Sequence, residues 1–394
     1  MVNINGIGDS LKIDFVTPID IKYSYRATEV QIYEYSKFMI ESGVESNVLV
    51  PTLPDTMSLP KARTDYQAIH EYFKKVPEKS IRGKKVVLPF NYTLYLYSGL
   101  PRDSVIYFAY SIYDHIWNVL TKPRGQKYVI AAHSMHLKDG HIIEGHRILE
   151  SFLNFFMKVT FSIGDAKRNV YHHVITTGEA EYLKRLGISE KNIIYVPTFV
   201  DTTVFRPRKN GSDKLQVMHI GGIDKDVSVV IGFINRMRDM GILDLFEFYF
   251  IGNNQEAELL DLSEKSSTVH CFTAIDEEQK ANIMSKMDVM LIPAVESFSR
   301  SMLEGLSSGL YIIADSRNPA ASEIKSKGGK IALVGKDVSQ YIEELKNLKE
   351  RKLASRSNFY SDRVTSRDII IREYDKAVVL RKILEMFMVV AKRG

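Results

Sequence analysis

Short apolar runs alternate with amphipathic segments along almost the whole chain. In the first half, apolar runs of strand length predict strands at Lys12–Thr17, Glu45–Val50, Lys85–Pro89, Val105–Phe108, Tyr128–Ala132, Val170–Thr176 and Asn192–Pro197. Segments whose apolar residues recur at helical spacing predict helices at Ala27–Ser42, Ile142–Ser162 and Glu179–Leu186. Strands that alternate with helices in this way are typical of an α/β fold.

The second half of the chain repeats the same alternation. Its predicted strands lie at Leu215–Ile220, Phe246–Ile251, Val269–Phe272, Val289–Pro293, Tyr311–Ala314 and Lys330–Leu333. Its predicted helices lie at Val227–Met240, Asp276–Lys286 and Ser339–Leu348 and around Glu304. Because helices separate the strands, a parallel sheet is the economical interpretation of this half.

The length of the chain predicts more than one domain. A chain of 394 residues suits two domains of about two hundred residues each. Residues 201–213 are polar and rich in structure breakers, which predicts the linker. We therefore expect an N-terminal domain at 1–200, a second domain at 201–365 and a C-terminal helical segment at 366–394.

Two segments stand outside the regular alternation. The polar stretch Leu53–Gly83 is expected to be an inserted loop or a small helical excursion, helical at best near Tyr66–Lys75. The final helix, Ser366–Ala391, combines an apolar stripe with several basic residues. Such a helix can lie on anionic lipid, but a helix that packs its stripe on the protein shows the same pattern and is favoured here.

Composition narrows the class of protein. Hydrophobic residues make up 45% of the chain and charged residues 26%, as in soluble globular proteins. The net charge of +5 is compatible with anionic donors, anionic membranes or nucleic acid and does not choose among them. No basic stripe interleaved with aromatic residues is present, so we expect no nucleic-acid partner.

The termini and the cysteine content suggest a location. The single Cys271 excludes an internal disulfide framework and a Cys-rich metal site, which indicates a reducing compartment. The N-terminus has neither the basic start nor the apolar core of a secretory signal, and no apolar run is long enough to span a bilayer. We expect a cytoplasmic protein, with peripheral attachment to the inner membrane face left open.

The most informative segment lies between Asp288 and Ala314. An apolar strand leads into a polar turn, a helix and a second apolar strand, with Glu296 at the end of the first strand. Glu304 follows inside the helix, about one and a half turns from its start at ~3.6 residues per turn. The amides that begin the helix lack intrahelical partners and form an anion site; they belong to Ser299, Arg300 and Ser301, with Ser297 and Ser299 able to cap. A ligand that carries both phosphate and sugar hydroxyls fits this arrangement.

The spacing of Glu296 and Glu304 and the residues around them resemble the signature of retaining glycosyltransferases of family 4, also called glycosyl transferases group 1. That signature runs from a strand through Pro and Glu to Phe, a small residue, Leu-Glu, a small helix and Gly-Leu before the next strand. The resemblance implies a GT-B fold, two Rossmann-like domains that face each other across a cleft. It also implies transfer of a sugar from a nucleoside diphosphate sugar to a hydroxyl acceptor, with retention of configuration.

The resemblance assigns catalytic and donor-binding roles in the second domain. Glu296 would hold hydroxyls of the transferred sugar and Glu304 those of the ribose, while the amides of 299–301 would hold the diphosphate. After the strand Leu215–Ile220, Gly221 and Gly222 form the turn that lets a diphosphate approach the backbone, and Lys225 matches the phosphate-binding lysine of the family. The family has an Arg where this chain has Gly222, and Arg300 and Arg26 are candidates to supply that charge.

In the first domain, the resemblance points to the ends of two strands. His133 ends an apolar strand where the family places a histidine that faces the donor sugar, with His136 as the fallback. Tyr25 and Arg26 are expected to contact the acceptor, because the glycine turn of the family is absent after the first strand and side chains must line that pocket. Whether the tyrosines there stack on a sugar ring or pack in the protein is left open.

Two further segments match the family in part. The hinge segment of the family corresponds to Thr198–Asp201, where Thr198 and Phe199 replace Asn and Gly, and Asp201 is either functional or a turn former. Family analogy places the nucleobase near Gly252 and near Ala274-Ile275, but the sequence does not reveal which base is bound. His172 and His173 precede an apolar run and are interpreted as structural.

We expect no metal and no cofactor beyond the nucleotide-sugar co-substrate, because Asp224 and Asp226 follow the wrong kind of element for a metal-binding Asp-x-Asp. The acceptor is left open among a glycan, a lipid-linked molecule and a small molecule. The main alternative is a sugar-nucleotide-binding or scaffold protein of the same fold with impaired catalysis, suggested by the missing Arg and glycine turn. An epimerase or phosphorylase of the same architecture is disfavoured by the glutamate pair.

Overall fold

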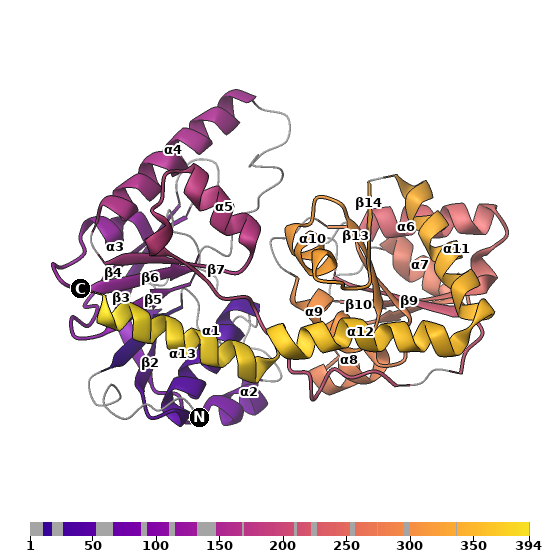
Figure 1. Ribbon diagram of the computed structural model, residues 1–394, viewed down its shortest axis with the longest axis horizontal. Coiled ribbons are helices and arrows are strands. Elements are labelled where there is room, and N and C mark those ends of the chain that lie inside the picture. The colour runs from indigo at the N-terminus through magenta and orange to yellow at the C-terminus, as the bar shows by residue number, and fades with distance from the viewer. Residues whose placement is uncertain are drawn as a thin grey trace. The chain divides into compact units, whose positions relative to one another are not determined.

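The chain forms two structural units. The computed structural model describes residues 11–17, 27–52, 66–87, 93–109, 115–131, 147–167, 169–208, 211–221, 227–252, 257–273, 275–294, 299–335 and 337–393. One unit comprises Met1–Pro197 together with Leu380–Gly394, and the other comprises Thr198–Val379. Each unit carries its own sheet flanked by helices (Figure 1).

The first unit is built on one sheet with the strand order β4-β3-β2-β1-β5-β6-β7-β8. Its strands are β1 (Lys12–Val16), β2 (Glu45–Thr52), β3 (Glu78–Val87), β4 (Thr93–Ser98), β5 (Val105–Phe108), β6 (Lys127–Ala131), β7 (Val170–Val174) and β8 (Ile193–Tyr195). All neighbours pair in parallel except β3 and β4, which are antiparallel. The carboxyl ends of the parallel strands therefore lie along one edge of the sheet.

The helices of the first unit follow the strands in the α/β manner. They are α1 (Ala27–Glu41), α2 (Tyr66–Phe73), α3 (Ile116–Leu120), α4 (Arg147–Ala166) and α5 (Thr177–Arg185), joined by the end of α13 (Lys376–Lys392). Local chemistry explains where α5 begins, because Thr176 and Glu179 form a reciprocal capping box. The ring of Phe387 on α13 lies 5.5 Å from that of Phe15 on β1, so the last helix contributes to the core of this unit.

The second unit has a sheet with the strand order β11-β10-β9-β12-β13-β14. Its strands are β9 (Leu215–Ile220), β10 (Phe246–Ile251), β11 (Val269–Phe272), β12 (Val289–Ile292), β13 (Tyr311–Asp315) and β14 (Ile331–Val334), all parallel. This is the doubly wound order, in which the direction of strand addition reverses between β9 and β12. The fold thus creates a topological switch point at the carboxyl ends of these two strands.

Helices cover both faces of the second sheet. They are α6 (Val227–Asp239), α7 (Ala257–Lys265), α8 (Glu277–Met284), α9 (Arg300–Ser307), α10 (Pro319–Ser326), α11 (Val338–Ala354) and α12 (Arg356–Tyr374). Neighbouring strand residues point to opposite faces: Val217 and Val289 belong to one apolar cluster, Met218 and Met290 to another. Burial on both faces explains why a strand such as β12 reads as a continuous apolar run.

The structure corrects two sequence predictions. The stretch Leu53–Gly83 was expected to be a loop or helical excursion, but its last part is strand, since β3 begins at Glu78. The single final helix Ser366–Ala391 is in fact two helices, α12 and α13, which meet at Asp375. Asp375 has an extended backbone, forms a bridge with Val200 and accepts a hydrogen bond from the Ala377 amide, so it caps a new helix there.

The apolar stripe of α13 is buried on the protein. Its buried residues are Val379, Leu380, Ile383, Leu384, Met386, Phe387 and Val390. This agrees with the interpretation favoured from the sequence, that the stripe packs on the protein. Within the described residues, none of the helices combines the length and apolar character that a membrane span requires.

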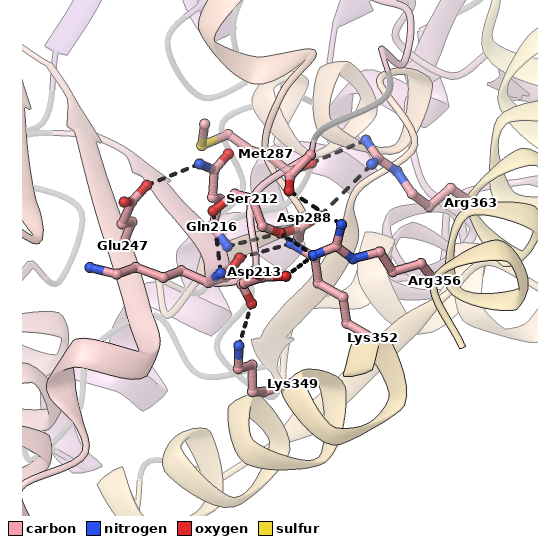
Figure 2. A network of polar contacts seen from close by, with 12 residues as sticks. Ser212, Asp213, Gln216, Glu247, Met287, Asp288, Lys349, Lys352, Arg356 and Arg363 are labelled. Atoms are coloured by element: carbon pink, nitrogen blue, oxygen red, sulfur yellow. Dashed lines mark hydrogen bonds and ion pairs between the residues drawn. The ribbon is translucent and has the colours of Figure 1, made fainter. Parts of the chain in front are cut away.

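A buried cluster of charges lies at the amino edge of the second sheet, beside the start of β12 (Figure 2). Asp288 Oδ2 accepts hydrogen bonds from the backbone amide of Gln216 at 2.9 Å and from Lys352 Nζ at 2.7 Å. Arg363 Nη1 lies 3.9 Å from Asp288 Oδ1, and its other donors reach backbone carbonyls, including that of Gly309. Asp288 and Lys352 are fully buried, so this cluster fixes α11 and α12 to the sheet at the edge opposite the switch point.

Candidate functional site

The candidate site lies on the carboxyl edge of the second sheet, at the switch point. β9 ends at Ile220 and β12 at Ile292, and these strands are hydrogen-bonded neighbours. After β9, Gly221 has φ 152°, a value that residues with a side chain rarely adopt. Its amide donates to the Ile251 carbonyl of β10, which holds the start of the turn against the sheet.

The start of α9 presents polar groups at this edge. Ser299 is the N-cap residue, with an extended backbone, but its hydroxyl makes no capping hydrogen bond. Instead, the hydroxyls of Ser299 and Ser301 lie 2.8 Å apart, while the amides of Met302 and Leu303 donate to the Ser299 carbonyl. The expectation that the Ser299 side chain caps the helix is therefore wrong, and the first-turn amides are left uncovered by that side chain.

Glu304 is buried between two cations. Its side chain is 2% exposed, and Lys280 Nζ lies 3.0 Å from Oε1 and 2.9 Å from Oε2. Arg300 Nε lies 3.2 Å from Oε1, one helical turn before Glu304. A buried carboxylate is stable only with such partners. The carboxylate thus holds Lys280 of α8 and Arg300 of α9 side by side.

The cations of this group are partly accessible. The side chains of Lys280 and Arg300 are 21% and 25% exposed. Arg300 Nη2 also pairs with Glu277 Oε1 at 2.9 Å, so carboxylates and cations alternate along the group. Lys280 Nζ lies 5.1 Å from the centre of the Phe205 ring, with which it makes a cation–π contact. We call Glu277, Lys280, Arg300 and Glu304 the α8–α9 charge group.

Sequence reasoning missed two members of the α8–α9 charge group. Lys280 and Glu277 lie on α8, which follows β11, and no motif singles them out. The only available signal was positional: α8 starts at a capping box formed by Asp276 and Gln279, so its first turns lie at the same sheet edge as the start of α9.

The other residues predicted for the second domain fall largely outside the described part of the chain. Gly222, Lys225, Glu296 and Ser297 lie in segments that the structure does not describe, as do Asp224, Asp226 and Ala274. Gly252 donates its amide to the Phe272 carbonyl, at the carboxyl ends of β10 and β11. The described part of the chain contains no group of three or more His, Cys, Asp or Glu residues able to hold a metal ion.

In the first unit, the residues predicted for the site follow the carboxyl ends of strands. Tyr25 and Arg26 follow β1, and His133 and His136 follow β6, but all four lie outside the described residues. β1 and β6 both neighbour β5, so their carboxyl ends share one edge of the sheet. The strand order thus brings the two segments that follow β1 and β6 to the same edge of the sheet. Where the four side chains lie stays a prediction.

Three residues have structural roles. Asp201 Oδ1 accepts hydrogen bonds from the Thr203 amide at 3.0 Å and hydroxyl at 2.6 Å, which identifies it as a turn former. His172 and His173 are fully buried, as the structural interpretation requires. Burial lowers the pKa of each imidazole to about 4, and His173 bridges the Tyr107 hydroxyl and the Val196 carbonyl.

Residues 214–351 match the family model described as glycosyl transferases group 1. This segment includes all six strands of the second sheet and the α8–α9 charge group. Among curated protein sequences, none matches the chain significantly.

Solved structures resemble the chain over nearly its whole length. The Anabaena protein HepE, solved with UDP and glucose, is 12% identical with a TM-score of 0.64, covering 96% of this chain and 99% of that one. Sucrose-phosphate synthase from Thermosynechococcus elongatus is 13% identical with a TM-score of 0.68, covering 98% and 100%. TarM from S. aureus, solved as a mutant with Fondaparinux, alpha-GlcNAc-glycerol and UDP, is 9% identical with a TM-score of 0.64, covering 96% and 99%.

These similarities confirm the predicted fold. The chain has the GT-B fold, with a Rossmann-like sheet in each of its two units. At such low identity the likeness extends to the fold alone.

Proposed function

We propose that the protein transfers a sugar from a nucleoside diphosphate sugar to a hydroxyl acceptor, with retention of configuration. The observation that carries the proposal is the position of the start of α9 at the switch point of a sheet whose sequence matches the glycosyl transferases group 1 model. Ligands of doubly wound sheets bind outside the carboxyl ends of the strands at this point. Helix N-termini there attract phosphate groups.

The diphosphate of the donor is the group that this edge suits best. The turn that starts at Gly221 allows close backbone approach, and the first amides of α9 point out of the helix end. Lys225 would neutralise one phosphate. Arg300 would supply the charge that the family draws from an Arg at the position of Gly222. Charges preorganised around a departing group lower reaction barriers strongly.

Glu304 would act through more than one contact. The sequence resemblance gives it the ribose hydroxyls, and its observed partners are Lys280 and Arg300. In the proposed complex the carboxylate keeps both cations in place beside the diphosphate and accepts a hydrogen bond from a ribose hydroxyl. Glu296 would hold hydroxyls of the transferred sugar and His133 would orient that sugar, while Tyr25 and Arg26 would contact the acceptor.

The proposed step balances without a cofactor or a metal. The bond between the anomeric carbon and the diphosphate oxygen breaks, and a bond forms on the same face between that carbon and the acceptor oxygen. The acceptor proton passes to the departing diphosphate, which leaves as the nucleoside diphosphate. No residue needs to form a covalent intermediate in this scheme, and exclusion of water limits hydrolysis of the donor.

The choice of nucleotide to test first comes from the solved structures. HepE and TarM were each solved with UDP. We therefore propose a uridine diphosphate sugar as the first donor to examine. Guanosine diphosphate sugars serve as the comparison.

Calorimetric titration with UDP, GDP and their sugars tests the binding half of the proposal. We expect one nucleotide class to bind and Glu304→Ala to weaken that binding. Release of nucleoside diphosphate from the donor in water then measures turnover without a known acceptor, and NMR of the first sugar released reports retention. Glu296→Gln is expected to abolish release while nucleotide binding persists.

Two results would argue against transfer. Absence of binding to every nucleotide and nucleotide sugar tested would refute the donor site itself. If the protein binds the donor but releases no nucleoside diphosphate, and Glu296→Gln binds the donor equally well, the alternative of a sugar-nucleotide-binding protein with impaired catalysis would be favoured. That alternative is motivated by Gly222, which stands where the family has an Arg.

A further inference from the structure

Large apolar side chains are exposed on two neighbouring helices of the first unit, α3 and α4. The exposed fractions are 51% for Trp117, 42% for Leu120, 66% for Phe155 and 39% for Val159. These four residues, which we call the α3–α4 face, are more than half of the large exposed apolar residues described in that unit. Clustered exposure of this kind marks an interaction surface, whereas single exposed residues are normal.

The exposure is not a by-product of loose packing. On α3, Asn118 and Val119 are buried beside the exposed Trp117, and on α4 Phe161 is fully buried. Val119 and Phe161 belong to the same apolar cluster of the core. Each helix therefore already has a buried side that attaches it to the unit, and the α3–α4 face is a second apolar surface without a role in that attachment.

Among the described side chains around the α3–α4 face, most of the charges are positive. Lys158 is exposed on α4 beside Phe155 and Val159. Lys122 and Lys167 donate to backbone carbonyls, those of Gln126 and Leu120, so carboxylates do not neutralise them there. The end of α4 is thereby held close to the end of α3.

The other described charges near the α3–α4 face leave it positively charged. Arg124 is exposed in the turn after α3. Of the side chains described in 115–125 and 155–169, only Asp165 is a carboxylate. It is only part-exposed and accepts hydrogen bonds from the Ser189 amide and the Asn192 side chain. The surroundings of the face are thus complementary to an anionic surface.

We propose that the α3–α4 face docks on an anionic lipid bilayer. Tryptophan and phenylalanine enter the interfacial layer of a bilayer, and flanking Lys and Arg residues are attracted to anionic headgroups. The residues of the face combine both features on adjoining helices. The basic C-terminal helix α13 does not offer this combination, since its apolar stripe is buried.

A second copy of the chain fits the face less well. A symmetric dimer would bring Lys158 and its surrounding cations against the same cations of the partner, and like charges in contact oppose association. An anionic bilayer presents the opposite charge and no defined shape, so it accommodates both the exposed rings and the cations.

Trp117 makes the proposal directly testable, because it is the only tryptophan in the chain. The full-length protein is mixed with vesicles of phosphatidylcholine alone or of an equimolar mixture with phosphatidylglycerol. We expect co-sedimentation and a blue shift of tryptophan emission only with the anionic vesicles. Brominated lipids should quench this emission, since the ring would lie in the interfacial layer.

Matched variants separate the face from general attraction of a basic protein to anionic lipid. Phe155→Ser and Lys158→Glu should each weaken vesicle binding by about ten-fold or more. The controls are Leu353→Ser and Lys346→Glu, which replace a large apolar residue by serine and a lysine by glutamate at exposed positions of α11 in the other unit. Both controls should bind vesicles as the parent protein does. Circular dichroism checks that every variant is folded.

Three results would overturn the proposal. They are no binding to anionic vesicles, binding without a change in Trp117 emission, and equal losses in the α11 controls. A dimer by light scattering that Phe155→Ser dissociates, with no vesicle binding, would assign the face to a second copy instead. Since vesicle binding needs no nucleotide, its failure would leave the proposed transfer reaction unaffected.

Discussion

Lys280 Nζ lies within 3.0 Å of both carboxylate oxygens of Glu304, although the two residues are 24 positions apart in the chain. This pair joins α8 to α9 at the edge where the proposed donor binds. Because the side chain of Glu304 is 2% exposed and that of Lys280 is 21% exposed, the pair anchors a cation at the border between protein and solvent.

Lys280→Gln is expected to lower the free energy of unfolding by roughly 1–3 kcal/mol, because a buried carboxylate loses its main partner. Urea unfolding measures the change. Lys265→Gln is the matched control: Lys265 pairs with Asp261 in a largely exposed ion pair, and the loss there should be below about 0.5 kcal/mol. Equal losses in the two variants would contradict the role assigned to Glu304.

Arg300→Gln is expected to weaken binding of the nucleoside diphosphate by about ten-fold, since one charge-assisted contact to a phosphate is lost. Calorimetric titration measures the affinity. Glu277→Gln is the control, because it removes one carboxylate partner of Arg300 and leaves the guanidinium in place. That variant should bind the nucleotide at least as tightly as the parent. Unchanged affinity in Arg300→Gln would show that the missing charge at Gly222 is supplied elsewhere.

Buried histidines predict acid sensitivity. Burial lowers the pKa of His115, His172 and His173 from 6.5 to about 4. The unfolded chain then binds more protons than the folded chain between these two values, so stability present above pH 6.5 is lost as the pH falls towards 4. Each histidine accounts for roughly 2 kcal/mol at pH 5. Urea unfolding at pH 7.5 and pH 5 measures the loss.

His172→Leu isolates one contribution to this acid sensitivity. Neither ring nitrogen of His172 has a hydrogen-bond partner within the described residues, and the ring packs against Phe161. Leucine preserves an apolar contact and cannot be protonated. The variant should therefore lose less stability between pH 7.5 and pH 5 than the parent protein. The same loss in both proteins would exclude His172 as a source of the effect.

Lys352→Met is expected to lower the free energy of unfolding by about 3–5 kcal/mol, because the buried Asp288 carboxylate would lose its closest cationic partner. Thermal and urea unfolding measure the loss. Arg356→Met is the control, since its pair with Asp213 is exposed. A loss no larger than that of Arg356→Met would contradict the role assigned to the Asp288–Lys352 pair.

The sequence predicted the second sheet more accurately than the edge of the first. β9 and β10 have the predicted bounds because most of their side chains are apolar and buried, which sets them apart from the polar segments on either side. β3 was predicted only from Lys85 and β4 was missed. The first residues of β3 are exposed, including Glu78 and Lys79, so the edge of the sheet reads as polar.

The candidate site shows a similar division. The position of Glu304 within a helix after a buried strand followed from local sequence, because strand, turn and helix are contiguous in the chain. Its pairing with Lys280 did not, since two residues on different helices meet only through the order of strands in the sheet. Likewise, the break at Asp375 depends on a bridge to Val200, which no local pattern reveals.

The return of the chain to its first unit affects when that unit can be completed. Residues 380–394 belong to it, and Phe387 lies against Phe15 and Tyr107 in its core. Domains near an N-terminus usually finish folding while the rest of a protein is still being synthesised. Here the first unit cannot bury these aromatic rings until the final helix has left the ribosome. A chain truncated before α13 would therefore leave the first unit with an open core.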